Sequence, residues 1–531
     1  MNLTQYIVFI FSTIILLSCA QIRPLTGGEK DAEPPKELES TPINGATNFI
    51  EKTITVEFDE FIKLTNVTSQ LIVSPLMETP PEIMVKGKKL VIKLQSDLSE
   101  NTTYSLNFGN AITDITESNI FPNYKYVFST GSYIDSLSYS GTVLNAFDLS
   151  KKESIYVLLY DQFEDSIPLK ELPRYVALTD KEGKYAITNI AQGEYKFFAI
   201  KDINSNYLFD LPNEEIAFMD KTIFIDSVSS ENTIHLFEEE SELQFLKKTE
   251  NKLFGKIDIQ LNLPANDLII TPLEQRFEKK WYIEDRNTTG DSLTMWLLIK
   301  DAFDNLEIEI KDGNEVIDTA NVRIIQSDEF TDTTLLISTN IKSSFDLNQN
   351  VIIELPRPLI NYQLDSILFY EDSVLIAVES IKVIGVTKLE LAYNFMENKE
   401  YELFVPPGTF EDVFGLKNDT IYSKFKTKKE ADYGIINLTV TPSFSENYII
   451  QLFQKEKLIQ ETYLKDSAEV QYKYLLPGDY GLKLIIDKNN NQKWNTGNYI
   501  EGLQPEKVIY YEKDIKIRAN WDNDISWIVN E

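Results

Sequence analysis

The sequence predicts an all-β protein made of tandem antiparallel β-sandwiches, and three observations lead to this fold class. Apolar and polar residues alternate in short segments, for example at 53–59, 90–94 and 104–108. Clusters of turn-forming residues, such as 86–88 and 99–101, bound these segments, and no long segment shows a helical period. The chain is also rich in Tyr, Phe, Ile and Val, which favour strands. Its 531 residues suffice for several domains of ordinary size.

The first eighteen residues predict a signal peptide. Residues 7–17 form an apolar stretch that is too short to span a membrane and has the length of a signal-peptide core. The residues before it carry no Lys or Arg, which departs from the usual positive start. The run Leu16-Leu17-Ser18-Cys19 resembles the bacterial lipobox. That resemblance implies cleavage before Cys19, a diacylglycerol on its sulfur and acylation of the new amino end. The alternative is a plain signal peptide followed by a free thiol.

Charge and cysteine content restrict the partners. Lys plus Arg is 51 and Asp plus Glu is 83, so the net charge is −32, which repels nucleic acid. We therefore expect no nucleic-acid partner. Cys19 is the only cysteine, so the body would contain no disulfide, and no second long apolar segment follows the leader. We expect a body tethered to the outer membrane through the N-terminal lipid, with the periplasmic and the surface face both left open.

The composition also suggests where the chain divides. Residues 20–35 are rich in Gly, Pro and charge, which predicts a flexible tether, and residues 237–251 read as an interdomain linker. The expected segments are a signal peptide at 1–18, a lipid-anchored tether at 19–34, and β domains at 35–132, 138–237, 249–327, 328–430 and 432–531, of which 249–327 is atypical.

Two internal repeats organise these domains. Residues 100–106, followed by a Phe-Ser-Thr strand end, recur as residues 397–403, followed by Phe-Lys-Thr. At an offset of 285, residues 193–195 and the loop after them recur from residue 478 onward. The chain therefore alternates two types of domain, which we call A and B, in the order A, B, A-like, A, B.

The repeats resemble known families. The A units, with their Asn-Thr-x-Tyr turn, residues 34–46 and residues 56–60, resemble the S-layer-type bacterial Ig-like domain. The B units, marked by Thr179-Asp180-x-x-Gly183, resemble prealbumin-like domains of the carboxypeptidase-regulatory or collagen-adhesin B kind. In overall order the chain is similar to Ig-like-domain lipoproteins of Bacteroidota-type bacteria. These motifs imply β-sandwich folds and do not specify an activity.

Two loops of the B units are candidates for Ca²⁺ sites. Alternate residues of a tight loop can direct carboxylate and amide oxygens toward one point, as a hard cation requires. Both loops depart from the EF-hand pattern, because neither has glycine at the sixth position or glutamate at the twelfth. Glu214, Glu215 or Glu501 would supply a late carboxylate. The alternative is that Asp and Asn bind their own backbone in Asx-turns. The candidate ligands are Asp202, Asn204, Asn206 and Asp210 in the first loop, and Asp487, Asn489, Asn491 and Asn495 in the second.

Few residues offer catalytic chemistry. His235 is the only histidine and lies in an alternating segment, so Ser–His and Cys–His centres and His-ligated zinc sites are excluded or nearly so. We expect each of the five tryptophans to belong to a core rather than to a glycan-stacking platform. The sequence thus predicts a non-catalytic envelope protein with a structural or binding role toward a protein or a glycan. The alternative is a glycan-processing hydrolase with a carboxylate pair in the atypical domain 249–327.

Overall fold

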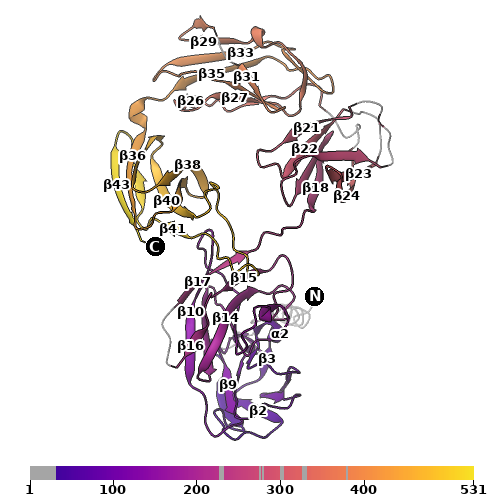
Figure 1. Cartoon of the computed structure of the whole chain (residues 1–531), viewed down its shortest axis with the longest axis vertical. Coiled ribbons are helices and arrows are strands. Elements are labelled where there is room, and N and C mark those ends of the chain that lie inside the picture. Colours follow the sequence, from indigo (N-terminus) through magenta and orange to yellow (C-terminus); the bar gives the residue numbers. More distant parts are fainter. Residues whose placement is uncertain are drawn as a thin grey trace, which may run out of the picture. The chain divides into compact units, whose positions relative to one another are not determined.

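The computed structural model describes residues 31–226, 232–273, 277, 280–298, 304–325, 332–377 and 381–530, and it confirms the all-β prediction (Figure 1). The leader, Cys19 and the tether up to residue 30 lie outside these ranges. The chain divides into two compact units. Unit 1 contains the residues up to 145 together with 150–236, and unit 2 contains 146–149 and the residues from 237 onward. None of the helices in the described ranges is long and apolar enough to cross a membrane.

Module 1, the first half of unit 1, is a sandwich around a core of aromatic and aliphatic side chains. Ile54, Val56 and Phe58 of β2 are fully buried while their neighbours point outward, because successive side chains of a strand face opposite sides. The sheets have the orders β1-β2-β6-β5 and β4-β7-β9, with β3 paired to β8. The elements are β1 (Glu37–Thr41), β2 (Thr53–Phe58), β3 (Ile62–Leu64), α2 (Val67–Gln70), β4 (Ile72–Ser74), β5 (Glu82–Lys86), β6 (Lys89–Lys93), β7 (Thr103–Asn107), β8 (Ile112–Asp114) and β9 (Lys125–Ser129).

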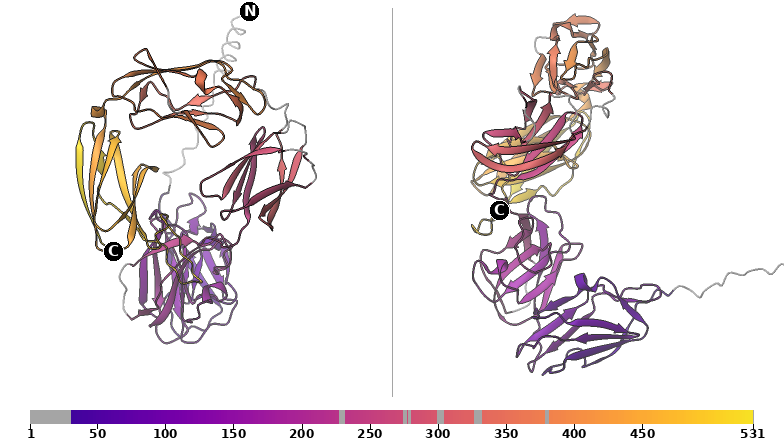
Figure 2. Two further views of the ribbon diagram at one scale, coloured as in Figure 1. Left: turned by 45° about the horizontal axis from the view of Figure 1, so that its top comes forward. Right: turned by 90° about the vertical axis from the view of Figure 1, so that its right-hand side faces the viewer.

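Module 2 completes unit 1 and lies directly against module 1 in the right-hand view of Figure 2. Its strands follow the order β12-β11-β14-β15-β17-β10-β13, with β16 paired to β14. The close parallel pair β10–β17 requires Gly141, because a Cβ atom there would lie 2.1 Å from the carbonyl oxygen of Asn232. The elements are β10 (Leu137–Asn145), β11 (Tyr156–Tyr160), η1 (Ile167–Leu169), β12 (Tyr175–Leu178), β13 (Lys184–Ile190), β14 (Gly193–Lys201), β15 (Glu215–Phe218), β16 (Ile223–Ile225) and β17 (Asn232–Glu238).

Module 3 opens unit 2 and has two sheets, β18-β19-β22-β21 and β20-β23-β24, around their own core. Its first strand begins at Leu246, inside the segment expected to be a linker. Charged residues fill this edge strand, so it shows no apolar alternation, and it is held mainly by backbone pairing to β19. The elements are β18 (Leu246–Leu253), β19 (Lys256–Leu261), β20 (Leu268–Pro272), β21 (Tyr282–Arg286), β22 (Ser292–Leu297), β23 (Asn305–Asp312) and β24 (Glu315–Arg323).

Module 4 repeats the strand pairing of module 1. The sheet β25-β27-β32-β31 corresponds to β1-β2-β6-β5, the pair β28–β34 to β3–β8, and the run β29-β33-β35 to β4-β7-β9. The elements are β25 (Ser338–Thr339), β26 (Ser344–Phe345), β27 (Val351–Glu354), β28 (Leu359–Tyr362), η3 (Leu364–Ser366), β29 (Leu368–Glu371), β30 (Val374–Ile376), β31 (Ile381–Ile384), β32 (Lys388–Leu391), β33 (Glu400–Val405), β34 (Phe410–Asp412) and β35 (Ile421–Thr427).

Module 5 repeats the strand pairing of module 2 in the same way. Strands β36 to β43 correspond in order to β10 to β17, including the parallel pairing of the first strand with the last. Parallel pairs depart from the antiparallel sheets that we expected. In the B units they join the first strand to the last, and in module 4 a short parallel pair joins β26 to β35. The elements are η4 (Glu430–Asp432), β36 (Gly434–Pro442), β37 (Asn447–Gln454), β38 (Lys457–Lys465), β39 (Ala468–Leu475), β40 (Gly478–Asp487), β41 (Val508–Tyr510), β42 (Ile515–Ile517) and β43 (Asp522–Val529).

Candidate functional site

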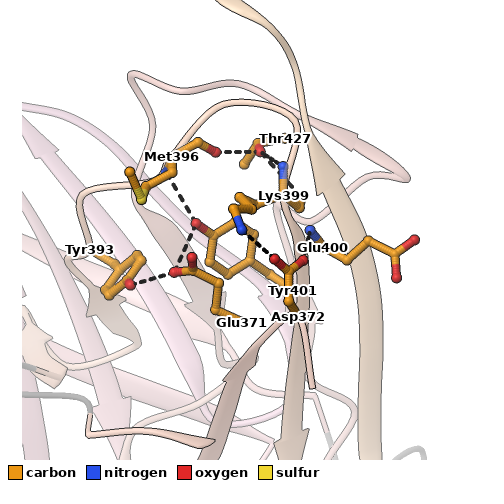
Figure 3. A network of polar contacts seen from close by, with 8 residues as sticks. All are labelled: Glu371, Asp372, Tyr393, Met396, Lys399, Glu400, Tyr401 and Thr427. Atoms are coloured by element: carbon orange, nitrogen blue, oxygen red, sulfur yellow. Dashed lines mark hydrogen bonds and ion pairs between the residues drawn. The ribbon is translucent and has the colours of Figure 1, made fainter. Parts of the chain in front are cut away.

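The first sequence repeat marks a turn that is fixed by hydrogen bonds (Figure 3). In module 4 the hydroxyl of Tyr401 accepts a hydrogen bond from the backbone N–H of Met396 at 3.1 Å. The hydroxyl of Thr427 accepts the N–H of Lys399 at 3.0 Å and donates to the carbonyl of Met396 at 2.6 Å. These bonds join the turn before β33 to the end of β35.

Module 1 contains the same bonds at the positions 297 residues earlier. Tyr104 accepts the N–H of Ser99 at 2.9 Å, and Thr130 accepts the N–H of Thr102 at 2.9 Å and donates to the carbonyl of Ser99 at 2.7 Å. Because the same side chains bond to the backbone in both copies, the sequence repeat is explained by the stability of this turn. These residues therefore have a structural role in both modules.

Acidic groups surround the turn of module 4 without forming a reactive pair. Glu371 accepts hydrogen bonds from the hydroxyls of Tyr393 at 2.8 Å and Tyr401 at 3.3 Å (Figure 3). Burial, together with the Glu371 carboxylate, raises the pKa of each tyrosine to about 12. Both hydroxyls therefore stay protonated at neutral pH and act as donors. Asp372 forms an ion pair with Lys399 at the surface.

The first predicted calcium loop is closed by its own hydrogen bonds. The Asp202 carboxylate accepts the backbone N–H groups of Ser205 at 2.6 Å and Tyr207 at 2.7 Å, as an Asx-turn does. The amide groups of Asn204 and Asn206 donate to the Asp210 carboxylate at 3.1 and 2.8 Å. The structure therefore brings the four predicted residues together, as the sequence spacing indicates.

The second loop has the same geometry. Asp487 accepts the N–H groups of Asn491 at 3.1 Å and Gln492 at 2.9 Å. The side-chain amides of Asn489 and Asn491 donate to the oxygen of Asn495 at 3.0 and 2.8 Å. Binding of Ca²⁺ would require the Asn amides of each loop to turn by about 180°, so that oxygen rather than nitrogen faces the centre.

A buried glutamate supports each loop. Glu214 accepts the N–H groups of Ile203 and Asp210, both at 3.0 Å. In the second loop Glu506 makes the equivalent bonds to Lys488 at 2.9 Å and Asn495 at 3.0 Å. The sequence suggested Glu501 as the late carboxylate of the second loop, but the residue in this position is Glu506. Seven additional residues lie between the second loop and its glutamate, so Glu506 follows Glu214 by 292 residues rather than by 285. Within the described ranges no group of three or more His, Cys, Asp or Glu residues could hold a metal ion. Calcium binding stays a prediction.

The histidine and the tryptophans are dispersed. His235 lies on β17 with an exposed side chain. Trp296 and Trp527 are buried, as expected, but Trp521 is 56% exposed and lies under the guanidinium of Arg518, so the expectation of a core position is wrong for this residue. Trp281 and Trp296 belong to module 3, and Trp494, Trp521 and Trp527 belong to module 5.

The atypical module contains a shallow pocket of about 400 Å³ on the outer face of the sheet β18-β19-β22-β21. The acids Glu250, Asp258 and Asp285 line it, and the first two have polar partners. Glu250 forms ion pairs with Lys248 and Lys252, and hydrogen bonds from both lysines lower the pKa of its carboxyl group. Asp258 accepts the hydroxyl of Thr294 at 2.7 Å. A glycosidase acid needs the opposite shift, toward higher pKa.

A larger groove lies within unit 1, where module 1 meets module 2. It has a volume of about 770 Å³, within the range common for small-molecule sites. One wall is the outer face of the sheet β4-β7-β9, and strands β12 and β13 supply much of the other. The two walls are joined by a hydrogen bond from the backbone N–H of Val176 to the hydroxyl of Ser74 at 3.1 Å. Half of the lining residues carry hydroxyl or amide side chains: Ser69, Gln70, Ser74, Ser105, Asn107, Asn110, Asn123, Ser154, Tyr156, Thr179, Thr188 and Ser205.

Nothing in the sequence predicts this groove. Ser105 and Asn107 alternate with the core residues Leu106 and Phe108, so their spacing indicates only the solvent face of a strand. No motif marks them, because the groove is assembled from two modules that are distant in sequence.

The family comparison agrees with the fold of module 1. Residues 31–130 match the family described as the bacterial Ig-like domain. No curated protein matches the chain. Among solved structures, the Bacillus anthracis TIE protein is 11% identical, with 95% of this chain and 75% of that chain covered and a TM-score of 0.15. Domains 1–6 of the surface layer protein SbsC are 10% identical, with coverage of 91% and 67% and a TM-score of 0.14.

At these identities and TM-scores the likeness to the solved structures carries no argument about function. The family match of module 1 and the β-sandwich architecture of the modules are the basis for describing the chain. The chain is a series of β-sandwich modules, the first of which matches the bacterial Ig-like domain, and this architecture indicates a structural or binding role.

Proposed function

We propose that this chain is a lipid-anchored protein of the bacterial cell envelope that acts as a non-catalytic structural or binding protein. Cys19 would hold it in the outer membrane, and the modules would bind an envelope protein or a glycan. The observation that carries this proposal is the series of five modules, each with a separate hydrophobic core. Such a series can place a binding surface at a distance from its anchor.

Two further details belong to the proposal. Modules 2 and 5 would be prealbumin-like domains, supported by their common strand pairing and by the recurring Gly-x-Tyr strand. In both, the tyrosine hydroxyl donates to the carbonyl four residues earlier at 2.8 Å, from Tyr195 to Ala191 and from Tyr480 to Leu476. The hydrolase alternative has less support, because Glu250 in the pocket of the atypical module is held ionised by lysines.

Mass spectrometry of the protein from its native host tests the anchor. We expect the mature chain to begin at Cys19 with diacylglycerol and an acylated amino end. A Cys19→Ser variant should be neither lipidated nor retained in the membrane fraction. Ser18→Ala is the matched control and should behave like the wild type, because a small residue still precedes Cys19. An uncleaved leader or an unmodified Cys19 would overturn the anchor.

Protease treatment of intact cells would then decide which face of the membrane carries the modules. Capture of partners with the full chain, from an envelope extract, tests the binding role. Turnover of an envelope glycan by the purified chain would overturn the non-catalytic assignment.

A further inference from the structure

A lysine without a carboxylate partner lies in the groove of unit 1. Lys125 stands on β9, and its side chain is on the outer face of the sheet beside Asn107, its cross-strand neighbour. Its ammonium donates to the hydroxyl of Thr188 on β13, and it forms no ion pair with any carboxylate in the described ranges. Burial lowers the pKa of this ammonium group. In a chain with 83 acidic residues, a half-buried lysine that bonds only to a neutral hydroxyl has capacity for an anion.

Buried hydroxyl groups surround this lysine with unused hydrogen-bonding capacity. Ser105 is only 6% exposed, and its hydroxyl bonds to no residue in the described part of the chain. Ser74 is 5% exposed and accepts one bond, from the N–H of Val176, so its own proton remains available to a ligand. Both serines line the groove, so a ligand there can reach their hydroxyls.

The equivalent face of module 4 shows the difference. Tyr422 occupies the position that corresponds to Lys125, 297 residues earlier, and donates to Glu402 at 3.0 Å. Lys424 on the same strand forms ion pairs with Glu400 and Glu402 at 3.0 and 3.3 Å. At the position of Lys125, module 4 thus has a neutral tyrosine, and the neighbouring Lys424 is neutralised within its own sheet. The open cation is a property of module 1 and not of the repeated scaffold.

The lining defines the ligand. Hydroxyl and amide groups recognise polyhydroxylated molecules, and the half-buried Lys125 recognises one negative charge. The other lysine of the lining, Lys181, stands in an exposed turn between Asp180 and Glu182. The side chains of Glu153, Asp180, Glu182 and Asp202 at other parts of the lining repel a polyanion. We propose that the groove binds a short acidic saccharide whose single carboxylate pairs with Lys125 and whose hydroxyls bond to Ser74 and Ser105. This inference rests on the binding role proposed above and names the ligand class of one site.

Calorimetric titration of the full chain in detergent tests the inference. The probe is a disaccharide that carries one glucuronate, and its matched partner has glucose in that position. We expect the acidic disaccharide to bind and the neutral one to bind about 10- to 100-fold more weakly, as expected for the loss of one charge-assisted hydrogen bond. Lys125→Gln should weaken the acidic probe by the same factor, and Lys125→Arg should retain most of the affinity.

Lys89→Gln is the matched control, because Lys89 lies on the other sheet of module 1 in an exposed ion pair with Glu57. Its affinity for the probe should equal that of the wild type. Equal binding of both disaccharides, unchanged binding by Lys125→Gln, or no binding of the acidic probe would each overturn the inference. Binding of acetate or inorganic phosphate as tight as that of the disaccharide would overturn the saccharide assignment. A protein that fails these tests but is lipidated at Cys19 and captures an envelope partner would still satisfy the proposed function.

Discussion

Module 4 contains a buried ion pair between Arg357 and Asp412, and its loss should destabilise the module. Arg357 donates from Nε to Asp412 at 2.8 Å and from Nη2 to Asp332 at 2.9 Å. The Asp412 side chain is fully buried and that of Arg357 is 7% exposed. The other carboxylate oxygen of Asp412 accepts the N–H groups of Phe414 and Leu416, each at 2.9 Å. Arg357→Met leaves this carboxylate buried without its cation.

Removal of one member of such a pair costs about 3–5 kcal/mol, much more than the loss of an exposed pair. Because each 1.4 kcal/mol is about a tenfold change in an equilibrium constant, opening of module 4 should become about 150- to 5,000-fold more frequent. Neutralising the partner as well, in Arg357→Met with Asp412→Asn, should recover part of this loss, since no unpaired charge then remains.

Hydrogen exchange of the full chain, measured by mass spectrometry, reports each module separately. We expect faster exchange in peptides from 351–427 and unchanged exchange in peptides from unit 1. Lys388→Met is the control, because its pair with Glu354 is half exposed at 3.3 Å and should change exchange by less than about sixfold. Similar effects of Arg357→Met and Lys388→Met would refute the reasoning that burial determines the cost.

Three further predictions concern the turns, the acid response and the loops. Tyr401→Phe leaves the backbone N–H of Met396 without its acceptor and should destabilise module 4 by about 1–3 kcal/mol, seen as faster hydrogen exchange in that module. Tyr422→Phe, at an exposed position, should change the hydrogen exchange of module 4 little. Burial alone would raise the pKa of the Glu215 carboxyl, but hydrogen bonds from its two lysine partners outweigh burial and lower it. The stabilisation by these ion pairs is therefore complete above the unfolded-state pKa and is lost as the pH falls through the folded-state pKa. The melting temperatures of the wild type and of Glu215→Gln should therefore converge between pH 7 and pH 3. A difference in melting temperature that does not narrow would contradict this. Calcium should raise the melting temperature of the wild type, and a chelator should reverse the rise. The double variant Asp202→Ala, Asp487→Ala should respond to neither. A wild type whose melting temperature is insensitive to a chelator would rule the calcium sites out.

The sequence is sufficient to predict the fold class because the signal is local. Ile54, Val56 and Phe58 alternate with polar residues, and alternation alone places them on the inner face of a strand. The repeat with Tyr104 could also be found in the sequence. Its meaning could not, because the bonds that explain it join the turn to Thr130, at the end of another strand.

The candidate groove cannot be predicted from the sequence, because it forms only where two modules pack together. Its cation, Lys125, meets Thr188 only because module 2 packs against module 1, and neither residue stands in a motif. Glu506 was missed because the loop before it is longer than in the first copy. Local periodicity specifies which face of a strand a residue occupies, whereas a ligand site depends on which modules share a surface.

The parallel pairing of first and last strands has a mechanical consequence. In module 2 the chain enters at the start of β10 and leaves at the end of β17, and five residue pairs from Gly141–Asn232 to Asn145–Leu236 join these strands. Tension between the two ends of this module would pull the strands in opposite directions along their length. The hydrogen bonds between β10 and β17 would then resist the force together, in shear, instead of breaking one after another. The parallel ladder would therefore give this module resistance to stretching along its strands.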